Sequence, residues 1–152
     1  MEMFLSMHIE FARENDFDPI CSLLAEDNLP FEDIRINHLK HFMVARDGKQ
    51  IIGVIGLELL GQTVLLRSLA IRSSSRGEGV GYVLTTRLEK YAASLEVKNI
   101  YLLTTTAEGY FSKTGYTKLA RNVVPEEIKS ISEFRELCPN SAVCMVKHLT
   151  NS

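Results

Sequence analysis

Three glycines at alternate positions, Gly77, Gly79 and Gly81, separate a predicted strand from a predicted long helix. Glycine adopts backbone conformations that other residues avoid, so this run can turn sharply and bring its N–H groups close to a ligand. The first N–H groups of a helix lack partners within the helix, and the macrodipole adds partial positive charge there. The loop 76–81 therefore predicts a cradle for a diphosphate. Arg76 can add a charge-assisted hydrogen bond to a phosphate oxygen.

The hydrophobic pattern changes at this loop. Three runs before it are typical of antiparallel strands: residues 41–45, 51–60 and 64–71. After it, apolar residues recur at helical spacing over residues 80–95, and residues 99–105 form an apolar strand-like run. A strand, a helix and a strand in this order predict a right-handed crossover between two parallel neighbours.

The remaining segments complete an α+β pattern. We expect a strand at 8–12, a helix capped by Asn15 or Asp16, short helices at 31–39 and 107–113, strands at 116–121 and 142–149, and a helix at 130–137 behind a capping box. The prediction is a mixed, mostly antiparallel sheet of about seven strands, with helices on both faces and a central parallel pair.

Length and composition limit the functional classes. A chain of 152 residues predicts a single domain over 8–152, and residues 1–7 precede the first patterned segment and are expected to be disordered. The net charge is −2 and the basic residues do not cluster, which argues against nucleic acid as a partner. No apolar run reaches the roughly 20 residues that a bilayer requires, so no membrane partner is expected.

Cysteine and histidine usage predicts no metal site. The three cysteines, Cys21, Cys138 and Cys144, lack zinc spacing, and the four histidines are scattered. Unpaired thiols of this kind pack as small hydrophobic groups and are typical of a reducing compartment, so we expect a cytoplasmic protein.

Three kinds of diphosphate loop have to be distinguished. A nucleoside-triphosphate P-loop requires Gly-Lys-Ser/Thr, whereas Gly81 is followed by Tyr82. A dinucleotide fingerprint requires its third glycine at position 82 and opens the first βαβ unit of a domain, whereas here three strands precede the loop. The third pattern, Arg/Gln-x-x-Gly-x-Gly/Ala, is matched by Arg76, Gly79 and Gly81.

On these residues, the chain resembles the GNAT superfamily of N-acetyltransferases, and the segment 107–116 resembles a second sequence signature of that superfamily. The resemblance implies acetyl-CoA as the donor, a small-molecule amine as the acceptor, and a splayed parallel strand pair that receives the pantetheine arm. We also expect the chain to form a homodimer. The cofactor-lining residues that it implies are Leu69, Ala70, Ile71, Arg76, Gly77, Glu78, Gly79, Val80, Gly81, Tyr82, Thr104, Ala107 and Phe111.

Two positions depart from the family pattern. Thr104 stands where the second signature usually has asparagine, and Phe111 where it often has the tyrosine that protonates the leaving thiolate. Tyr110 is rotated by about 100° from that position on a helix. Tyr110 and Tyr116 are the candidate acids, although the reaction can also proceed without one. The alternative function is a non-catalytic acyl-CoA-binding module.

A narrower resemblance points to a GNAT branch associated with bacterial arsenic-resistance operons. It is carried by residues 29–30, 56–58, 65–69, 102–108 and 137–142. Related enzymes of this kind acetylate the amino group of an organoarsenical glutamate analogue, which makes an amino-acid-like acceptor an expectation.

Aminolysis of a thioester requires a proton route and a stabilised oxyanion. Glu58, at the end of an apolar run, is the candidate for the proton route, and the backbone N–H groups of 69–71 are the candidate oxyanion donors. Arg67 lies in an apolar run and either holds an acidic substrate or pairs with Glu58. Ser68 can face the same substrate as Arg67 only if the strand contains a bulge, because neighbouring residues of a regular strand point to opposite faces. Arg121 is a further candidate for binding the substrate.

Overall fold

A computed structural model describes residues 7–130 and 142–149 of the chain. The strands are β1 (Met7–Phe11), β2 (Phe42–Asp47), β3 (Gln50–Leu60), β4 (Thr63–Ile71), β5 (Asn99–Thr104), β6 (Thr117–Leu119) and β7 (Val143–His148). The helices are α2 (Phe17–Glu26), α3 (Val80–Ser94), α4 (Glu108–Lys113) and α5 (Glu126–Lys129). Short 3-10 helices are η1 (Glu14–Asp16), η2 (Ile36–His41), η3 (Ser73–Ser75) and η4 (Arg121–Val123).

The seven strands follow the order β1-β2-β3-β4-β5-β7-β6 in one mixed sheet. The pairs β1/β2, β2/β3, β5/β7 and β6/β7 are antiparallel, and β4/β5 is parallel. The parallel register covers only three pairs, from Val64–Ile100 to Leu66–Leu102, although β4 continues for five further residues. The predicted α+β fold with one central parallel pair is therefore confirmed.

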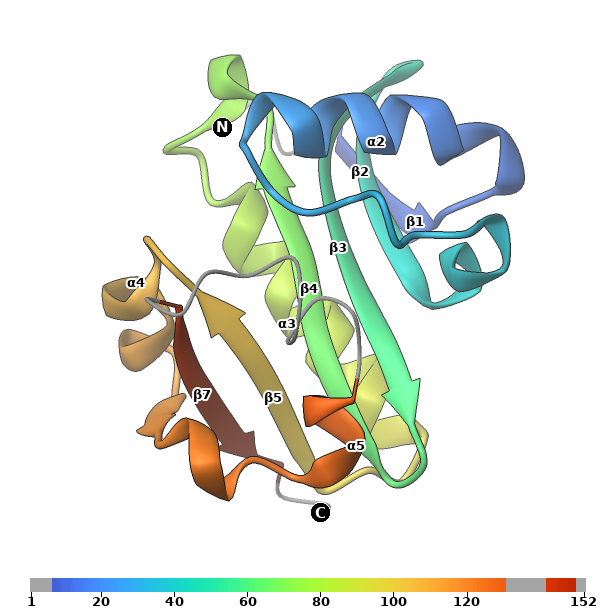
Figure 1. Cartoon of the computed structure of the whole chain (residues 1–152). Helices are drawn as coiled ribbons and strands as arrows, with labels where there is room; N and C mark the ends of the chain where they lie inside the picture. Colours follow the sequence, from blue (N-terminus) through green and yellow to red (C-terminus); the bar gives the residue numbers. More distant parts are fainter. Residues whose placement is uncertain (1–6, 131–141, 150–152) are drawn as a thin grey trace. The chain divides into compact units, whose positions relative to one another are not determined.

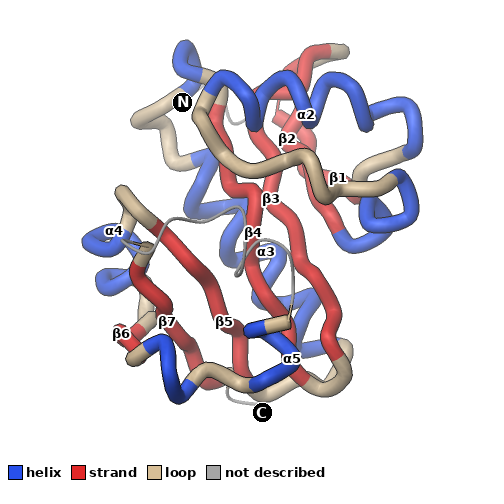
Figure 2. Tube along the Cα trace, in the orientation of Figure 1, coloured by secondary structure: helices blue, strands red, loops and turns tan. Residues whose placement is uncertain are grey.

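The chain divides into two compact units, each built from two segments. The first contains the residues up to Leu57 together with Ser68–Leu88, and the second contains Glu58–Arg67 together with the residues from Glu89 onward. Both units combine strands with helices (Figure 2). The first carries β1, β2, α2 and the glycine loop (Figure 1), and the second carries β5, β7, α4 and α5.

Apolar packing explains why helices cover both faces of the sheet in the first unit. On one face, α2 places Ile20, Leu23 and Leu24 against buried residues of the sheet, among them Val44 and Val54. On the other face, α3 packs against the backbone of β3 at Gly53, where its side chains come within van der Waals range. Each fully buried leucine or isoleucine contributes about 1.5–3 kcal/mol, so this layering outweighs local propensity.

A smaller core stabilises the second unit. Leu65 of β4, Cys144 of β7 and Ile128 of α5 are buried together, with Val124 beside them. Cys144 therefore packs as a small apolar group, and burial raises the pKa of its thiol.

Some local predictions differ from the structure. The helix expected at 31–39 is a 3-10 helix over Ile36–His41, and the strand expected at 116–121 is confined to Thr117–Leu119. Met7, which the sequence placed in a disordered tail, begins β1. The helix expected at 130–137 and the thiol of Cys138 lie outside the described residues.

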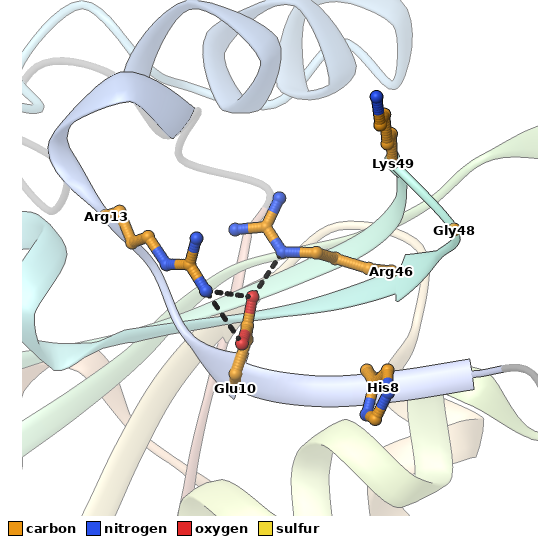
Figure 3. A pocket seen from close by; sticks show the side chains of 6 residues that line it. All are labelled: His8, Glu10, Arg13, Arg46, Gly48 and Lys49. Atoms are coloured by element: carbon orange, nitrogen blue, oxygen red, sulfur yellow. Dashed lines mark hydrogen bonds and ion pairs between the residues drawn. The ribbon is translucent and has the colours of Figure 1, made fainter.

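Asp16 precedes α2 as predicted, but its carboxylate does not cap the helix. The carboxylate accepts hydrogen bonds from the backbone N–H of Arg13 at 2.8 Å and from the guanidinium of Arg46 at 2.5 Å. Arg46 also pairs with Glu10, which in turn accepts two hydrogen bonds from Arg13 (Figure 3). These four charged residues tie β1, η1 and β2 together. Glu10, Arg13 and Arg46 also line an open pocket, together with His8, Gly48 and Lys49.

The arginines change the acid–base properties of this cluster. The hydrogen bond from Arg46 lowers the pKa of the Glu10 carboxyl. Burial alone would raise the pKa of Asp16, but the hydrogen bonds from Arg46 and from the Arg13 backbone outweigh burial and lower it. Carboxyls with a lowered folded-state pKa stabilise the fold above their unfolded-state pKa, and this contribution is lost as the pH falls through the folded-state pKa.

We therefore expect Asp16→Asn to lower the free energy of unfolding by about 1–3 kcal/mol at pH 7. The difference from the wild type should begin to shrink below about pH 4, where Asp16 of the unfolded chain binds a proton, and should disappear once the pH falls below the lowered folded-state pKa of Asp16. Urea denaturation at pH 7 and pH 3 measures both differences. Asp18→Asn, an exposed change in the first turn of α2, is the control. An equal deficit of Asp16→Asn at both pH values would contradict the lowered pKa of Asp16.

Candidate active site

The glycine loop has the conformation that its sequence requires. Gly77 and Gly79 lie in the left-handed region, with φ of 81° and 83°, which residues with a side chain rarely adopt. Helix α3 begins directly after them at Val80, and the N–H groups of its first turn have no partners inside the helix. The loop and the helix start thus present backbone donors and the positive end of the helix macrodipole, the chemistry that binds a diphosphate.

The position of the helix start depends on Gly53 of β3. A Cβ at this residue would lie 3.0 Å from the Cδ1 atoms of Ile71 and Leu84 and 3.2 Å from Cγ1 of Val80. Val80 and Leu84 are buried side chains of the first two turns of α3. The hydroxyl of Thr85 donates to the Gly81 carbonyl at 2.8 Å and strengthens the same turns. The absence of a side chain at Gly53 therefore lets α3, and the cradle at its end, lie directly on β3.

Replacing Gly53 with alanine should disturb the fold and the cradle together. We expect a loss of about 1–3 kcal/mol in unfolding free energy, because three side chains must shift to admit the methyl group. Coenzyme A, the cofactor that the family resemblance implies, should also bind several-fold more weakly, because Val80 at the start of α3 is among those side chains. Denaturation and calorimetric titration measure the two effects.

Gly109→Ala is the matched control, since a Cβ at Gly109 meets no atom within 4 Å and alanine favours a helix by up to about 1 kcal/mol. Wild-type stability and wild-type affinity in Gly53→Ala would contradict the close-packing argument.

Arg76 does not extend freely from the loop. Its Nε donates to the Ile71 carbonyl at 3.1 Å, and its Nη2 forms an ion pair with Asp27 at the end of α2. The sequence predicted a phosphate contact for this guanidinium. In the structure two of its donors are engaged within the protein.

The alternation of β4 breaks at Ser68. Ser68 has a φ of 63°, in the left-handed region, and both Arg67 and Ser68 are buried. Beyond Ser68 the strand continues through residues 69–71, the candidate oxyanion donors, and reaches the glycine loop after η3. A serine held in this conformation costs on the order of 1–2 kcal/mol, and strain of this kind concentrates at functional sites.

Glycine within a strand is normally less stable than alanine, and the strain at Ser68 predicts the reverse order at this position. Ser68→Gly should be more stable than Ser68→Ala by about 1 kcal/mol, because only glycine adopts this φ without strain. Thermal denaturation of both variants tests the order. Ala70→Gly, in the same strand, should instead destabilise. If alanine proved the more stable replacement at position 68, the left-handed conformation of Ser68 would be wrong.

Arg67 pairs with Glu58, one of the two alternatives that the sequence left open. Arg67 Nη1 donates to Glu58 Oε1 at 3.1 Å. The Arg67 side chain is 2% exposed and the Glu58 side chain 22%. Solvent and small molecules can therefore reach the carboxylate more readily than the guanidinium. Removing the carboxylate would weaken the compensation of a buried charge, so the pair is also structural.

The second signature forms a turn and a short helix in the second unit. Thr104 Oγ1 accepts a hydrogen bond from the backbone N–H of Ala107 at 2.9 Å and so closes the turn between β5 and α4. Phe111 of α4 is buried, and Tyr110 beside it is half-buried. The Phe111 ring makes edge contacts with the rings of Tyr110 and Tyr116, with centroid distances of 5.0 and 5.3 Å.

The Tyr116 hydroxyl is engaged in a buried polar network. It donates to Glu89 Oε2 at 3.0 Å, and Lys147 Nζ donates to Glu89 Oε1 at 3.0 Å and to the Thr114 carbonyl at 2.9 Å. Burial raises the pKa of Tyr116 far above its ordinary value, and the adjacent Glu89 carboxylate raises it further. Of the two tyrosines proposed as acids, Tyr110 is therefore the more accessible.

Arg121 begins η4 rather than extending a strand. Its Nη1 donates to the Ala142 carbonyl at 3.0 Å, which places the guanidinium beside the start of β7. Within the described residues no group of three or more His, Cys, Asp or Glu side chains is arranged to hold a metal ion. No helix in the described part of the chain is long and apolar enough to cross a membrane.

The fold is that of several solved acetyltransferases. The chain superposes with a TM-score of 0.83 and 18% identity on N-acetylglutamate synthase from Neisseria gonorrhoeae, solved with coenzyme A and N-acetyl-glutamate. This match covers 95% of the chain but only 35% of the gonococcal enzyme. Rv2747 from Mycobacterium tuberculosis, solved with CoA and NLQ, gives a TM-score of 0.79 at 20% identity and covers 94% of this chain and 99% of Rv2747.

Sequence comparison identifies the family. The model of the acetyltransferase (GNAT) family matches residues 6–116, so the chain belongs to this family. An uncharacterized N-acetyltransferase, CT2212 from Chlorobaculum tepidum, is 28% identical over 121 residues, which cover 75% of this chain and 74% of that protein. The chain is thus a member of a family of acetyltransferases, and the two solved structures named above share its fold.

Proposed function

We propose that this acetyltransferase acetylates the amino group of an amino-acid-like small molecule. The observation that carries the proposal is the Arg67–Glu58 pair at 3.1 Å, which joins β3 and β4. An amino acid presents an ammonium group, which the partly exposed Glu58 carboxylate can bind, and a carboxylate, which the positive charge of the neighbouring Arg67 attracts. A polyamine has no group that matches a guanidinium. The gonococcal enzyme of the same fold was solved with N-acetyl-glutamate in one complex and with L-arginine in another.

The proposed reaction is direct aminolysis of the thioester of acetyl-CoA, the proposed acetyl donor. The neutral amine attacks the acetyl carbonyl, an N–C bond forms and the C–S bond breaks. The amine proton leaves through Glu58, and the thiolate of coenzyme A takes up a proton as it departs. The backbone N–H groups of residues 69–71 stabilise the oxyanion.

Each remaining predicted site residue has a role in this proposal. Tyr110 supplies the proton to the thiolate. Tyr116 holds Phe111 in position, because the centroids of the two rings lie 5.3 Å apart in an edge contact. The loop 76–82 holds the diphosphate, while Thr104, Ala107 and Phe111 line the thioester end of the cofactor. Ser68 and Arg121 contact the acceptor.

The resemblance to the arsenic-associated branch suggests one acceptor in particular. An organoarsenical analogue of glutamate retains the amino and carboxyl groups that the Arg67–Glu58 pair would recognise. We therefore include such an analogue among the acceptors to be tested. We also propose that the protein acts in the cytoplasm, where acetyl-CoA and amino acids are both present, as a monomer or a homodimer.

The acceptor class is tested by release of coenzyme A thiol with a panel of amines. We expect turnover with glutamate-like amino acids or their arsenic-containing analogue, and little turnover with polyamines. Binding of acetyl-CoA without thiol release on any amine would contradict a catalytic role. Turnover on polyamines alone would contradict the acceptor class.

The role of Glu58 is tested by Glu58→Gln, which keeps the shape of the side chain and can still accept a hydrogen bond from Arg67. We expect kcat to fall by about 10²–10⁴-fold, while coenzyme A affinity stays unchanged. Glu127→Gln, an exposed change in α5, is the control. An unchanged kcat with reduced thermal stability would show that Glu58 is only structural.

A further inference from the structure

Asp27 occupies a well-defined position at the C-terminus of α2. The helix ends in a Schellman motif, in which Leu29 N–H bonds to the Leu24 carbonyl at 3.0 Å and Asn28 N–H to the Ala25 carbonyl at 3.1 Å. Asn28 takes the left-handed conformation that this motif requires, with a φ of 56°. The backbone that carries Asp27 is therefore fixed.

An acidic residue at this position is electrostatically unfavourable. The helix macrodipole places partial negative charge at the C-terminus, where a cation is favoured and a carboxylate is not. The Asp27 side chain is only 16% exposed, so solvent screens the repulsion incompletely. The compensating cation is Arg76, the first residue of the glycine loop.

Arg76 in turn joins three segments of the first unit. Its Nη2 pairs with Asp27 of α2, its Nε donates to the Ile71 carbonyl at the end of β4, and its backbone leads into Gly77. The first part of the loop has little packing of its own, because even a Cβ added at Gly77 would meet no atom within 4 Å. A glycine segment without packing contacts keeps a defined conformation only if its ends are anchored.

We propose that Asp27 is a positioning residue for the cofactor. By fixing the Arg76 guanidinium against the end of β4, it anchors the loop 76–81 and arranges the loop's N–H groups before the diphosphate arrives. This proposal rests on the loop being the diphosphate site. It explains why a carboxylate, that of Asp27, follows the C-terminus of α2, where it does not stabilise the helix itself.

Simple electrostatics predicts the opposite effect of removing Asp27. A carboxylate near a diphosphate repels it, so Asp27→Asn would tighten binding if Asp27 acted only through its charge. If Asp27 anchors Arg76, the same change weakens binding, because the cofactor must then order the loop. The sign of the change in affinity therefore separates the two explanations.

The test measures the affinity of the full-length protein for coenzyme A by calorimetry, without an acceptor amine. We expect Asp27→Asn to weaken binding by about five- to tenfold. Glu26→Gln removes the same charge one residue earlier, from an exposed side chain, and should change the affinity less than about twofold. Tighter binding by Asp27→Asn, or equal affinities of the two variants, would overturn the proposal.

A second variant separates positioning from a general loss of structure. Arg76→Lys retains the charge but replaces two separate donor nitrogens, Nε and Nη2, by a single ammonium group, so it should weaken coenzyme A binding to a similar degree. The double variant should bind no more weakly than either single variant, because both changes break the same anchor. Acetyl-pantetheine, which lacks the diphosphate, should bind all variants equally.

The possible outcomes have distinct meanings. Additive losses in the double variant, or an equal loss of acetyl-pantetheine binding, would overturn the positioning role. If the wild type itself failed to bind coenzyme A, the assignment of the loop would be at fault. A lack of turnover with every amine tested would contradict the proposed reaction and leave the positioning role of Asp27 unaffected, because the coenzyme A titrations contain no acceptor amine.

Discussion

The candidate site depends most on the close approach of α3 to β3 at Gly53. Without a side chain at this position, the strand backbone accepts Val80 and Leu84 directly, at distances of 3.0–3.2 Å from the position of a Cβ. This contact fixes where the helix begins. The unpaired N–H groups of the first turn and the positive end of the macrodipole are fixed with it. A single contact between a helix and a strand thus determines where an anion can bind.

Two kinds of unfavourable energy accompany this arrangement. Ser68 holds a left-handed backbone conformation within β4, and Arg67 beside it is a buried cation. Both cost stability on their own, and the Glu58 carboxylate compensates only the second. Proteins retain such costs where a site requires them, and the backbone segment 69–71 that follows them carries the proposed oxyanion donors. Strain and buried charge together mark the strand on which the chemistry is proposed.

The parts of the fold that the sequence predicted depend on local patterns. The glycine loop, the helix after it and the parallel crossover follow from periodicity and from the backbone freedom of glycine. Periodicity does not reveal which distant polar groups meet. Asp27 and Arg76 are 49 residues apart, and Tyr116 and Glu89 are 27 apart. The pairing of Arg67 with Glu58 was predicted as one alternative, because a hairpin brings such residues together.

The charged cluster of Glu10, Arg13, Arg46 and Asp16 has a consequence for association between molecules. It joins β1 to β2 and η1 by ion pairs. Strand β1 ends the sheet on one side, and among the described residues no strand pairs with its outer edge. Exposed edges of this kind recruit strands from other chains unless charge or shortness prevents it. Ion pairs border β1, and β6 at the opposite end is only three residues long. Both ends of the sheet thus discourage its extension into a second molecule.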